Sequence, residues 1–110
     1  MFGEFLLSPK VNNIIDESLT RVRDDQMSMT LTMYFCFSSH NTYLSGHQLT
    51  GESMCHMYRE ALLMGCRCVE LDLWDGSNNE PKITHGYTLT SELTLRSALK
   101  VIKESAFVTS

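Results

Sequence analysis

Two stretches of the sequence place side chains capable of chemistry inside segments that otherwise look buried. In SSHNTYL, His40 and Asn41 come just after an apolar run. In VELDLWDG, Glu70 and Asp72 stand two residues apart inside another apolar run. Two carboxylates on one buried face repel each other and lose hydration, so they need a cation or a shared proton. The amide and carboxylate oxygens of these residues suit calcium or magnesium and not zinc.

His85, in KITHGYT, adds a second imidazole to this set. Imidazoles suit acid–base chemistry near neutral pH. Together with an oxygen-bound cation, they indicate metal-assisted displacement at phosphorus, in which the metal and a cationic histidine offset charge on the phosphate oxygens. Each residue also has a structural alternative. A lone histidine after a strand is often only hydrogen-bonded, Asn41 could serve a turn, and the two acids could face solvent.

Three extended segments are expected to position these residues. TLTMYFCF (30–37) is rich in threonine and aromatic residues, with apolar residues on both faces, as in a strand covered on both sides. CRCVELDLW (66–74) is a second strand, and KITHGYT (82–88) is a short third one. Side chains alternate along a strand, so the second has one face with Cys66, Cys68, Glu70 and Asp72 and another with Arg67, Val69, Leu71 and Leu73.

Two helices are expected between and after these strands. The segment 51–65 repeats apolar residues at helical spacing, with Ser53 as a possible N-cap, Gly65 at its end and a stripe of Met54, Met57, Tyr58, Ala61 and Leu62. The segment 93–107 has Thr94 as a possible N-cap and a stripe of Leu95, Ala98, Leu99 and Ile102.

The order strand, helix, strand, short strand, helix is typical of βαβ units and a parallel sheet, which is an α/β class. Functional groups in such folds gather at the carboxyl ends of the strands. We therefore expect five side chains to converge on one rim: His40, Asn41, Glu70, Asp72 and His85.

The composition fits a soluble globular protein, with 43% hydrophobic and 20% charged residues. With 9 basic and 13 acidic residues, the formal charge of −4 provides no basic footprint for nucleic acid and no polybasic anchor for anionic lipid. No stretch is apolar over the roughly 20 residues that a transmembrane helix needs. The start, MFGEFLLSPK, is a poor secretory signal, so we expect an intracellular location.

The four cysteines are not arranged as a disulfide framework is in a small secreted protein. Cys66 and Cys68 resemble a C-x-C metal fragment, but no second close-spaced pair accompanies them, and buried thiols packing as small hydrophobes are the simpler interpretation. A structural zinc module built from Cys36, Cys66, Cys68 and His85 stays open as a minor alternative.

SSHNTYL, GCRCVELDLWDG and HGYTLTS, in this order and spacing, closely resemble the X box of eukaryotic phosphoinositide-specific phospholipase C. The resemblance runs from about Met27 to Ser110 and implies the first half of a distorted TIM barrel. The expected fold class is therefore α/β, the N-terminal part of a TIM-like (β/α) barrel, incomplete. FGEFLLSP resembles the tail of the EF-hand region before that barrel. The resemblance therefore implies two regions. Residues 1–26 are the end of an EF-hand-like region and a linker, and residues 27–110 are a partial phospholipase C X-box catalytic domain.

The family cleaves phosphatidylinositol 4,5-bisphosphate into diacylglycerol and inositol 1,4,5-trisphosphate with one Ca²⁺ ion. By resemblance, His40 stabilises the charged pentacoordinate phosphorus, and His85 protonates the diacylglycerol oxygen and later activates water. Asn41, Glu70 and Asp72 match three calcium ligands, and Glu70 also matches the base for the inositol 2-hydroxyl.

The resemblance also implies a truncated chain. The family's fourth calcium ligand, the second half of the barrel and the other phospholipase C domains have no counterpart in these 110 residues. The implied partners are those missing parts and a phosphoinositide headgroup at a membrane surface. The implied location is cytoplasmic and peripheral at the inner face of the plasma membrane. We expect the isolated chain to fold poorly and to have little or no activity. The alternative is a catalytically silent product that only binds a partner or competes with the full enzyme.

Overall fold

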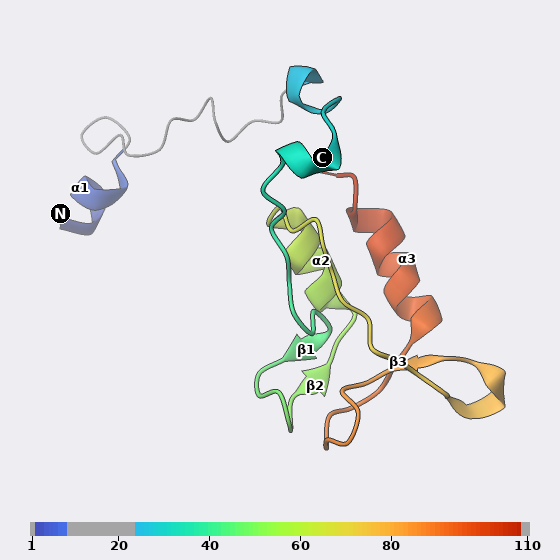
Figure 1. Cartoon of the computed structure of the whole chain (residues 1–110). Coiled ribbons are helices and arrows are strands. Elements are labelled where there is room, and N and C mark those ends of the chain that lie inside the picture. Colours follow the sequence, from blue (N-terminus) through green and yellow to red (C-terminus); the bar gives the residue numbers. More distant parts are fainter. Residues whose placement is uncertain (1, 9–23, 109–110) are drawn as a thin grey trace. The chain divides into compact units, whose positions relative to one another are not determined.

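Residues 2–8 and 24–108 are described by the computed structural model of the chain (Figure 1). They belong to two units, Met1–Met33 and Tyr34–Ser110. The first contains α1 (Phe2–Leu7) and two short 3-10 helices, η2 (Asp24–Gln26) and η3 (Leu31–Met33). Most of the predicted EF-hand-like end and linker (1–26) lies outside the described residues, so that assignment stays a prediction.

The second unit contains two small antiparallel sheets. β1 (Leu44–Ser45) pairs with β2 (Glu52–Ser53) in one of them. In the other, β4 (Lys82–Ile83) lies between β3 (Leu73–Trp74) and β5 (Leu93–Thr94). The 3-10 helix η4 (Ser77–Asn79) lies in the connection from β3 to β4. The register aligns Leu73, Ile83 and Leu93 across the sheet.

Parallel pairing occurs between the two segments that flank α2 (His56–Leu63) in the sequence. Ser38 and Cys68 form an isolated parallel bridge, in which the Ser39 amide donates to the Cys68 carbonyl at 2.9 Å. The Arg67 amide donates to the Phe37 carbonyl at 2.8 Å. A parallel contact between two segments with a helix between them is the connection that the predicted strand–helix–strand unit requires, but neither segment forms a strand at this bridge.

The predicted extent of the strands is wrong. Within the described residues, 30–37 contains η3 and no strand, 66–74 forms a strand only at β3, and 82–88 only at β4. The sheets are antiparallel, where a parallel sheet was predicted. A strand persists only where its backbone groups pair with a neighbour, and the backbone pairing of 30–37 with residues 67–68 involves Phe37, at the very end of the run. Phe35 and Phe37 are accordingly exposed, not covered on both faces.

The two helices form where the apolar stripes predicted them, with different ends. α2 begins after Cys55, so Ser53 is not its N-cap. Gly65 follows its C-cap with φ +96°, the left-handed conformation expected there. α3 (Leu95–Ser105) begins after Thr94, whose side chain accepts a hydrogen bond from the Ser97 amide at 3.3 Å, which confirms the predicted N-cap.

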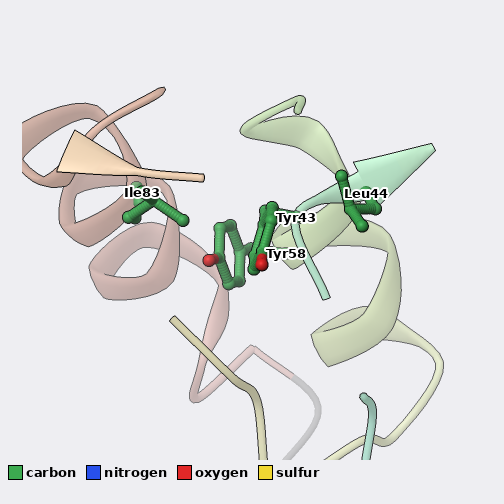
Figure 2. Close-up of a cluster of buried hydrophobic side chains, with 5 residues drawn as sticks. Tyr43, Leu44, Tyr58 and Ile83 are labelled. Carbon is green, nitrogen blue, oxygen red and sulfur yellow. The ribbon is translucent and has the colours of Figure 1, made fainter. Parts of the chain in front are cut away.

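α2 and α3 pack against each other (Figure 1), and they contribute Tyr58 and Ala98, respectively, to the core. Figure 2 shows the Tyr43 and Tyr58 rings at its centre, between Ile83 and Leu44. Val69 and Leu71 pack against this cluster, as their predicted face requires. The stripe of α3 differs from prediction at one position, because Leu99 is 51% exposed. The remaining partly buried residues on the core are Leu93, Leu95, Val101 and Ile102.

None of the helices in the described residues is long and apolar enough to cross a membrane.

Thr94→Ala tests the cap of α3. Losing the side-chain acceptor leaves the Ser97 amide without its partner, so we expect the free energy of unfolding to fall by about 1 kcal/mol. The check is amide hydrogen exchange at Ser97 and the following residues of α3, together with urea unfolding. Thr94→Ser, which keeps the hydroxyl, is the control and should behave as the unmodified chain does. Equal protection of Ser97 in the alanine and serine variants would contradict the assigned cap.

Candidate functional site

Asn41 turns the chain just after the parallel bridge. Its φ of 47° lies in the left-handed region, which asparagine enters more readily than most residues. Its backbone amide donates to Glu70 Oε2 at 2.6 Å. The Glu70 amide in turn donates to Thr42 Oγ1 at 3.0 Å. These two hydrogen bonds hold the side chain and backbone of Glu70 against residues 41–42, and Asn41 and Thr42 are both buried.

Tyr43 connects Asp72 to the same segment. Its hydroxyl donates to Asp72 Oδ2 at 2.5 Å and lies 3.4 Å from Asn41 Oδ1. The backbone of Asp72 is anchored separately, because its carbonyl accepts from the Thr84 amide at 3.2 Å. The structure therefore brings polar groups of Asn41, Glu70 and Asp72 together around residues 41–43.

Gln48 connects this group to His85. Its side-chain Oε1 accepts from Asn41 Nδ2 at 2.6 Å, and its backbone carbonyl lies 2.6 Å from His85 Nδ1. A carbonyl oxygen can only accept, so the His85 tautomer assigned from this contact carries its hydrogen on Nδ1. The other ring nitrogen of His85, Nε2, is then the one available for proton exchange.

His40 directly precedes Asn41 but is not part of the hydrogen bonds that link the other four predicted residues. Its side chain is exposed, and no hydrogen bond joins it to Glu70, Asp72 or His85 among the described residues. It lines a hollow of about 270 Å³ beside α2, together with Asn41, Met57 and Glu60. Convergence of all five residues on one rim was predicted; hydrogen bonds through Tyr43 and Gln48 link four of them, and the convergence of His40 with these four stays a prediction.

A second hollow, of about 430 Å³, is lined by Asp72, Trp74, His85 and Gly86. The Trp74 ring packs on the backbone at Gly86, so closely that a Cβ there would overlap the ring, with Cε2 at 2.6 Å. Tyr87 meets Trp74 edge-on with ring centroids 5.4 Å apart. Glycine at position 86 therefore lets the indole close one side of the hollow next to His85.

Burial dominates the electrostatics of the two core tyrosines. Burial raises the pKa of Tyr43 well above its usual range, and its hydrogen bond to the Asp72 carboxylate raises this pKa further. Burial likewise raises the pKa of Tyr58, with smaller contributions from Cys55, Asp72 and Glu70. Both phenols are neutral at physiological pH, so the Tyr43 hydroxyl acts as a hydrogen-bond donor.

The donor set fits a hard cation such as calcium. Glu70 and Asp72 each have one carboxylate oxygen in a hydrogen bond, and neither Glu70 Oε1 nor Asp72 Oδ1 has a partner among the described residues. Asn41 Oδ1, 3.4 Å from the Tyr43 hydroxyl that holds Asp72, adds a third oxygen of the kind that calcium prefers. No group of three or more histidine, cysteine or acidic side chains in the described part of the chain is placed to hold a metal ion. The Cys66 thiol instead lies within hydrogen-bond distance of the Phe37 and Cys68 carbonyls, at 3.3 and 3.2 Å.

Two members of the site, Tyr43 and Gln48, were not predicted from the sequence. Tyr43 had a usable signal, since a buried tyrosine hydroxyl needs a partner and two polar residues, Asn41 and Thr42, precede it. Gln48 lies in a polar turn with no distinguishing pattern, so only the folded structure identifies its contacts with Asn41 and His85.

A family profile described as "Phosphatidylinositol-specific phospholipase C, X domain" matches residues 27–110. One curated relative is the 1-phosphatidylinositol 4,5-bisphosphate phosphodiesterase epsilon-1 of Caenorhabditis elegans, 48% identical over 99% of this chain. Another is the corresponding beta-1 phosphodiesterase of Bos taurus, 47% identical over 94% of the chain. The chain spans only 6% and 9%, respectively, of the lengths of these relatives.

Two solved structures are also similar. S. officinalis PLC21 matches with a TM-score of 0.79 and 44% identity over 99% of this chain and 14% of its own. L. pealei PLC21 matches with a TM-score of 0.72 and 52% identity over 74% of this chain and 11% of its own. These matches confirm the predicted fold class, with the chain corresponding to a small part of a TIM-barrel catalytic domain.

Gly86→Ala tests the packing beside His85. Because the added methyl overlaps the indole, we expect Trp74 to swing outward and the free energy of unfolding to fall by about 1–3 kcal/mol. Trp74 is the single tryptophan, so its emission should shift to the red and acrylamide should quench it more strongly. Gly3→Ala, at a position where a Cβ meets no atom within 4 Å, is the control. Unchanged emission in Gly86→Ala would be incompatible with the packing described.

The buried tyrosines predict sensitivity to alkali. Below pH 10 both phenols are neutral in the folded and the unfolded chain, so their contribution to stability is complete there. Above the ordinary tyrosine pKa of about 10, only the unfolded chain ionises them, and each costs up to about 1.4 kcal/mol per pH unit. Urea unfolding between pH 9 and 11 measures this loss. Tyr58→Phe should lose less stability over that interval than the unmodified chain, and an equal loss in both would contradict the assignment.

Proposed function

Because this chain belongs to the phosphatidylinositol-specific phospholipase C X-domain family, we propose that it carries the first part of a calcium-dependent phosphodiesterase site. The substrate is phosphatidylinositol 4,5-bisphosphate, and the products are diacylglycerol and inositol 1,4,5-trisphosphate. The observation that carries the proposal is the hydrogen-bonded group of Asn41, Glu70 and Asp72, which presents hard oxygens at one place.

Calcium would be held by Asn41 Oδ1 and by the carboxylates of Glu70 and Asp72. The contacts described above leave one oxygen of each carboxylate without a partner among the described residues, which supports this ligand set. When bound, calcium would make the inositol 2-hydroxyl more acidic and offset charge on the phosphate. Three protein ligands hold calcium weakly, because ligand number and carboxylate charge set the affinity. The remaining ligand belongs to the parts of the barrel outside these 110 residues.

Glu70 and His85 divide the proton transfers. In the first step Glu70 takes the proton of the inositol 2-hydroxyl while that oxygen attacks phosphorus. The bond from phosphorus to the diacylglycerol oxygen breaks, and His85 in its imidazolium form protonates the departing oxygen from Nε2. In the second step neutral His85 takes a proton from water, whose oxygen opens the cyclic phosphate, and Glu70 returns its proton to the 2-oxygen. The hydrogen bond from Nδ1 to the Gln48 carbonyl supports this role, since it leaves Nε2 available.

His40 stabilises the negative charge on the pentacoordinate phosphorus. For this role its ring must turn from the hollow beside α2 toward the phosphate. The side chain is exposed and has no hydrogen bond among the described residues, so no such contact opposes the rotation.

The chain works together with the rest of a barrel at a membrane surface. Its relatives are roughly ten times longer or more, since it spans 6% to 9% of the first curated relatives. The remaining barrel strands, the other phospholipase C domains and a phosphoinositide headgroup are the proposed partners, and nucleic acid is not among them. The proposed location is cytoplasmic, peripheral at the inner face of the plasma membrane, and the 110 residues alone have little or no activity.

A second candidate function follows from the position of His40. His40 and His85 line different hollows, whereas the proposed reaction needs both imidazoles at one phosphate. A catalytically silent product, which binds a partner or competes with a full enzyme, is the function that this separation favours.

The test is release of inositol trisphosphate from vesicles that contain phosphatidylinositol 4,5-bisphosphate. The chain is assayed alone and within a chimaera in which residues 27–110 replace the matching segment of the Bos taurus beta-1 phosphodiesterase. We expect calcium-dependent turnover by the chimaera and little by the chain. His40→Ala and His85→Ala should each lower turnover about 10²–10⁴-fold.

His56→Ala is the matched control, because His56 is an exposed histidine at the start of α2 outside both hollows. It should leave turnover unchanged. A chimaera that is fully active with chelator present, or that keeps its turnover in His85→Ala, would overturn the proposed function. A chimaera without any turnover, combined with a chain that slows the intact Bos taurus enzyme, would favour the silent product.

A further inference from the structure

Tyr43 holds its hydroxyl at a fixed place. The residue is fully buried, and its ring packs in the cluster with Tyr58, Ile83 and Leu44 (Figure 2). A ring held on several sides by neighbouring side chains cannot rotate without opening a void, so the core determines where the hydroxyl lies.

The hydroxyl selects which oxygen of Asp72 remains available. A phenol has one hydrogen to donate, and the shorter of its two contacts, 2.5 Å, goes to Asp72 Oδ2. This contact prevents the carboxylate from rotating freely about its last bond, and it leaves Oδ1 without a partner among the described residues.

The same hydroxyl lies 3.4 Å from Asn41 Oδ1, on the oxygen side of that amide. The nitrogen side is fixed by Gln48, whose Oε1 accepts from Asn41 Nδ2 at 2.6 Å. This hydrogen bond to Gln48 orients the amide, so that its oxygen lies on the side of the Tyr43 hydroxyl. The hydroxyl therefore lies near oxygens of two proposed calcium ligands but donates its one hydrogen to Asp72.

Tyr58 is the natural comparison, because it is a buried tyrosine whose hydroxyl is hydrogen-bonded to the backbone. It is equally buried and lies in the same cluster, yet its hydroxyl donates to the backbone carbonyl of Glu70 at 3.0 Å. The Tyr58 hydroxyl therefore has no hydrogen bond to a side-chain oxygen of a proposed ligand. The Tyr43 hydroxyl has one, to Asp72 Oδ2.

We propose that Tyr43 is a positioning residue for the cation, which presets Asp72 Oδ1 before the ion arrives by holding Asp72 Oδ2 from within the core. This inference rests on the proposed function, because it takes Asn41 and Asp72 as calcium ligands. Residues that orient metal ligands in this way typically change metal affinity or activity 10–100-fold when they are removed.

The experiment compares Tyr43→Phe with Tyr58→Phe in the chimaera described above, since each substitution removes one buried hydroxyl and keeps the ring. Calcium affinity is measured by isothermal titration calorimetry, and the calcium concentration for half-maximal turnover is measured separately. We expect Tyr43→Phe to weaken calcium binding about tenfold or more. Turnover of this variant at saturating calcium should return close to that of the unmodified chimaera. Tyr58→Phe should shift neither calcium measurement.

Equal calcium affinities in the two variants would overturn the positioning role while leaving the proposed function intact. A loss of turnover in Tyr43→Phe that saturating calcium does not restore would also overturn it, because that pattern indicates general damage to the fold. Asp72→Asn distinguishes failure of the Tyr43 role from failure of the proposed function, since it removes a proposed calcium ligand. If the unmodified chimaera binds calcium no better than Asp72→Asn, the proposed function fails, and the role of Tyr43 fails with it.

Discussion

The constraint on which the site depends is that two carboxylates, two residues apart, lie beside a buried core. Glu70 and Asp72 follow the one parallel contact of the chain segments described, between Ser38 and Cys68. That contact aligns residues 41–43 with residues 70–72. The alignment lets the Asn41 amide reach Glu70 and the Tyr43 hydroxyl reach Asp72. Val69, just before Glu70, and Leu71, between the two acids, pack on the core. The packing of Val69 and Leu71 on the core therefore fixes the backbone that carries Glu70 and Asp72.

The sequence predicted what depends on local periodicity. The stripe around Tyr58 and Leu62 located α2, and the hydroxyl of Thr94 located the start of α3, because both signals act within one helical turn. Prediction failed where the outcome depends on a distant neighbour. The apolar run 30–37 looks like a covered strand, yet Phe35 is exposed and no strand forms there among the described residues. Pairing, and not composition, decides whether such a run becomes a strand.

The site shows the same division. Alternation along 66–74 identified Glu70 and Asp72, and their chemistry indicated a cation, because like charges on a buried face need one. The role of Tyr43 depends on a hydroxyl that crosses from one segment to another 29 residues away, which no local pattern encodes. His40 precedes the left-handed turn at Asn41 and lines the hollow beside α2, while Asp72 and His85 line the other hollow.

The most direct measurement is a crystal structure of the calcium-soaked chimaera, with anomalous diffraction recorded at long wavelength to locate the ion. We expect one calcium peak within about 2.3–2.6 Å of Asn41 Oδ1, Asp72 Oδ1 and an oxygen of Glu70, with the Tyr43 hydroxyl still on Asp72 Oδ2. No peak at saturating calcium, or a peak whose ligands include neither Glu70 nor Asp72, would contradict the claim that Asn41, Glu70 and Asp72 form a calcium site.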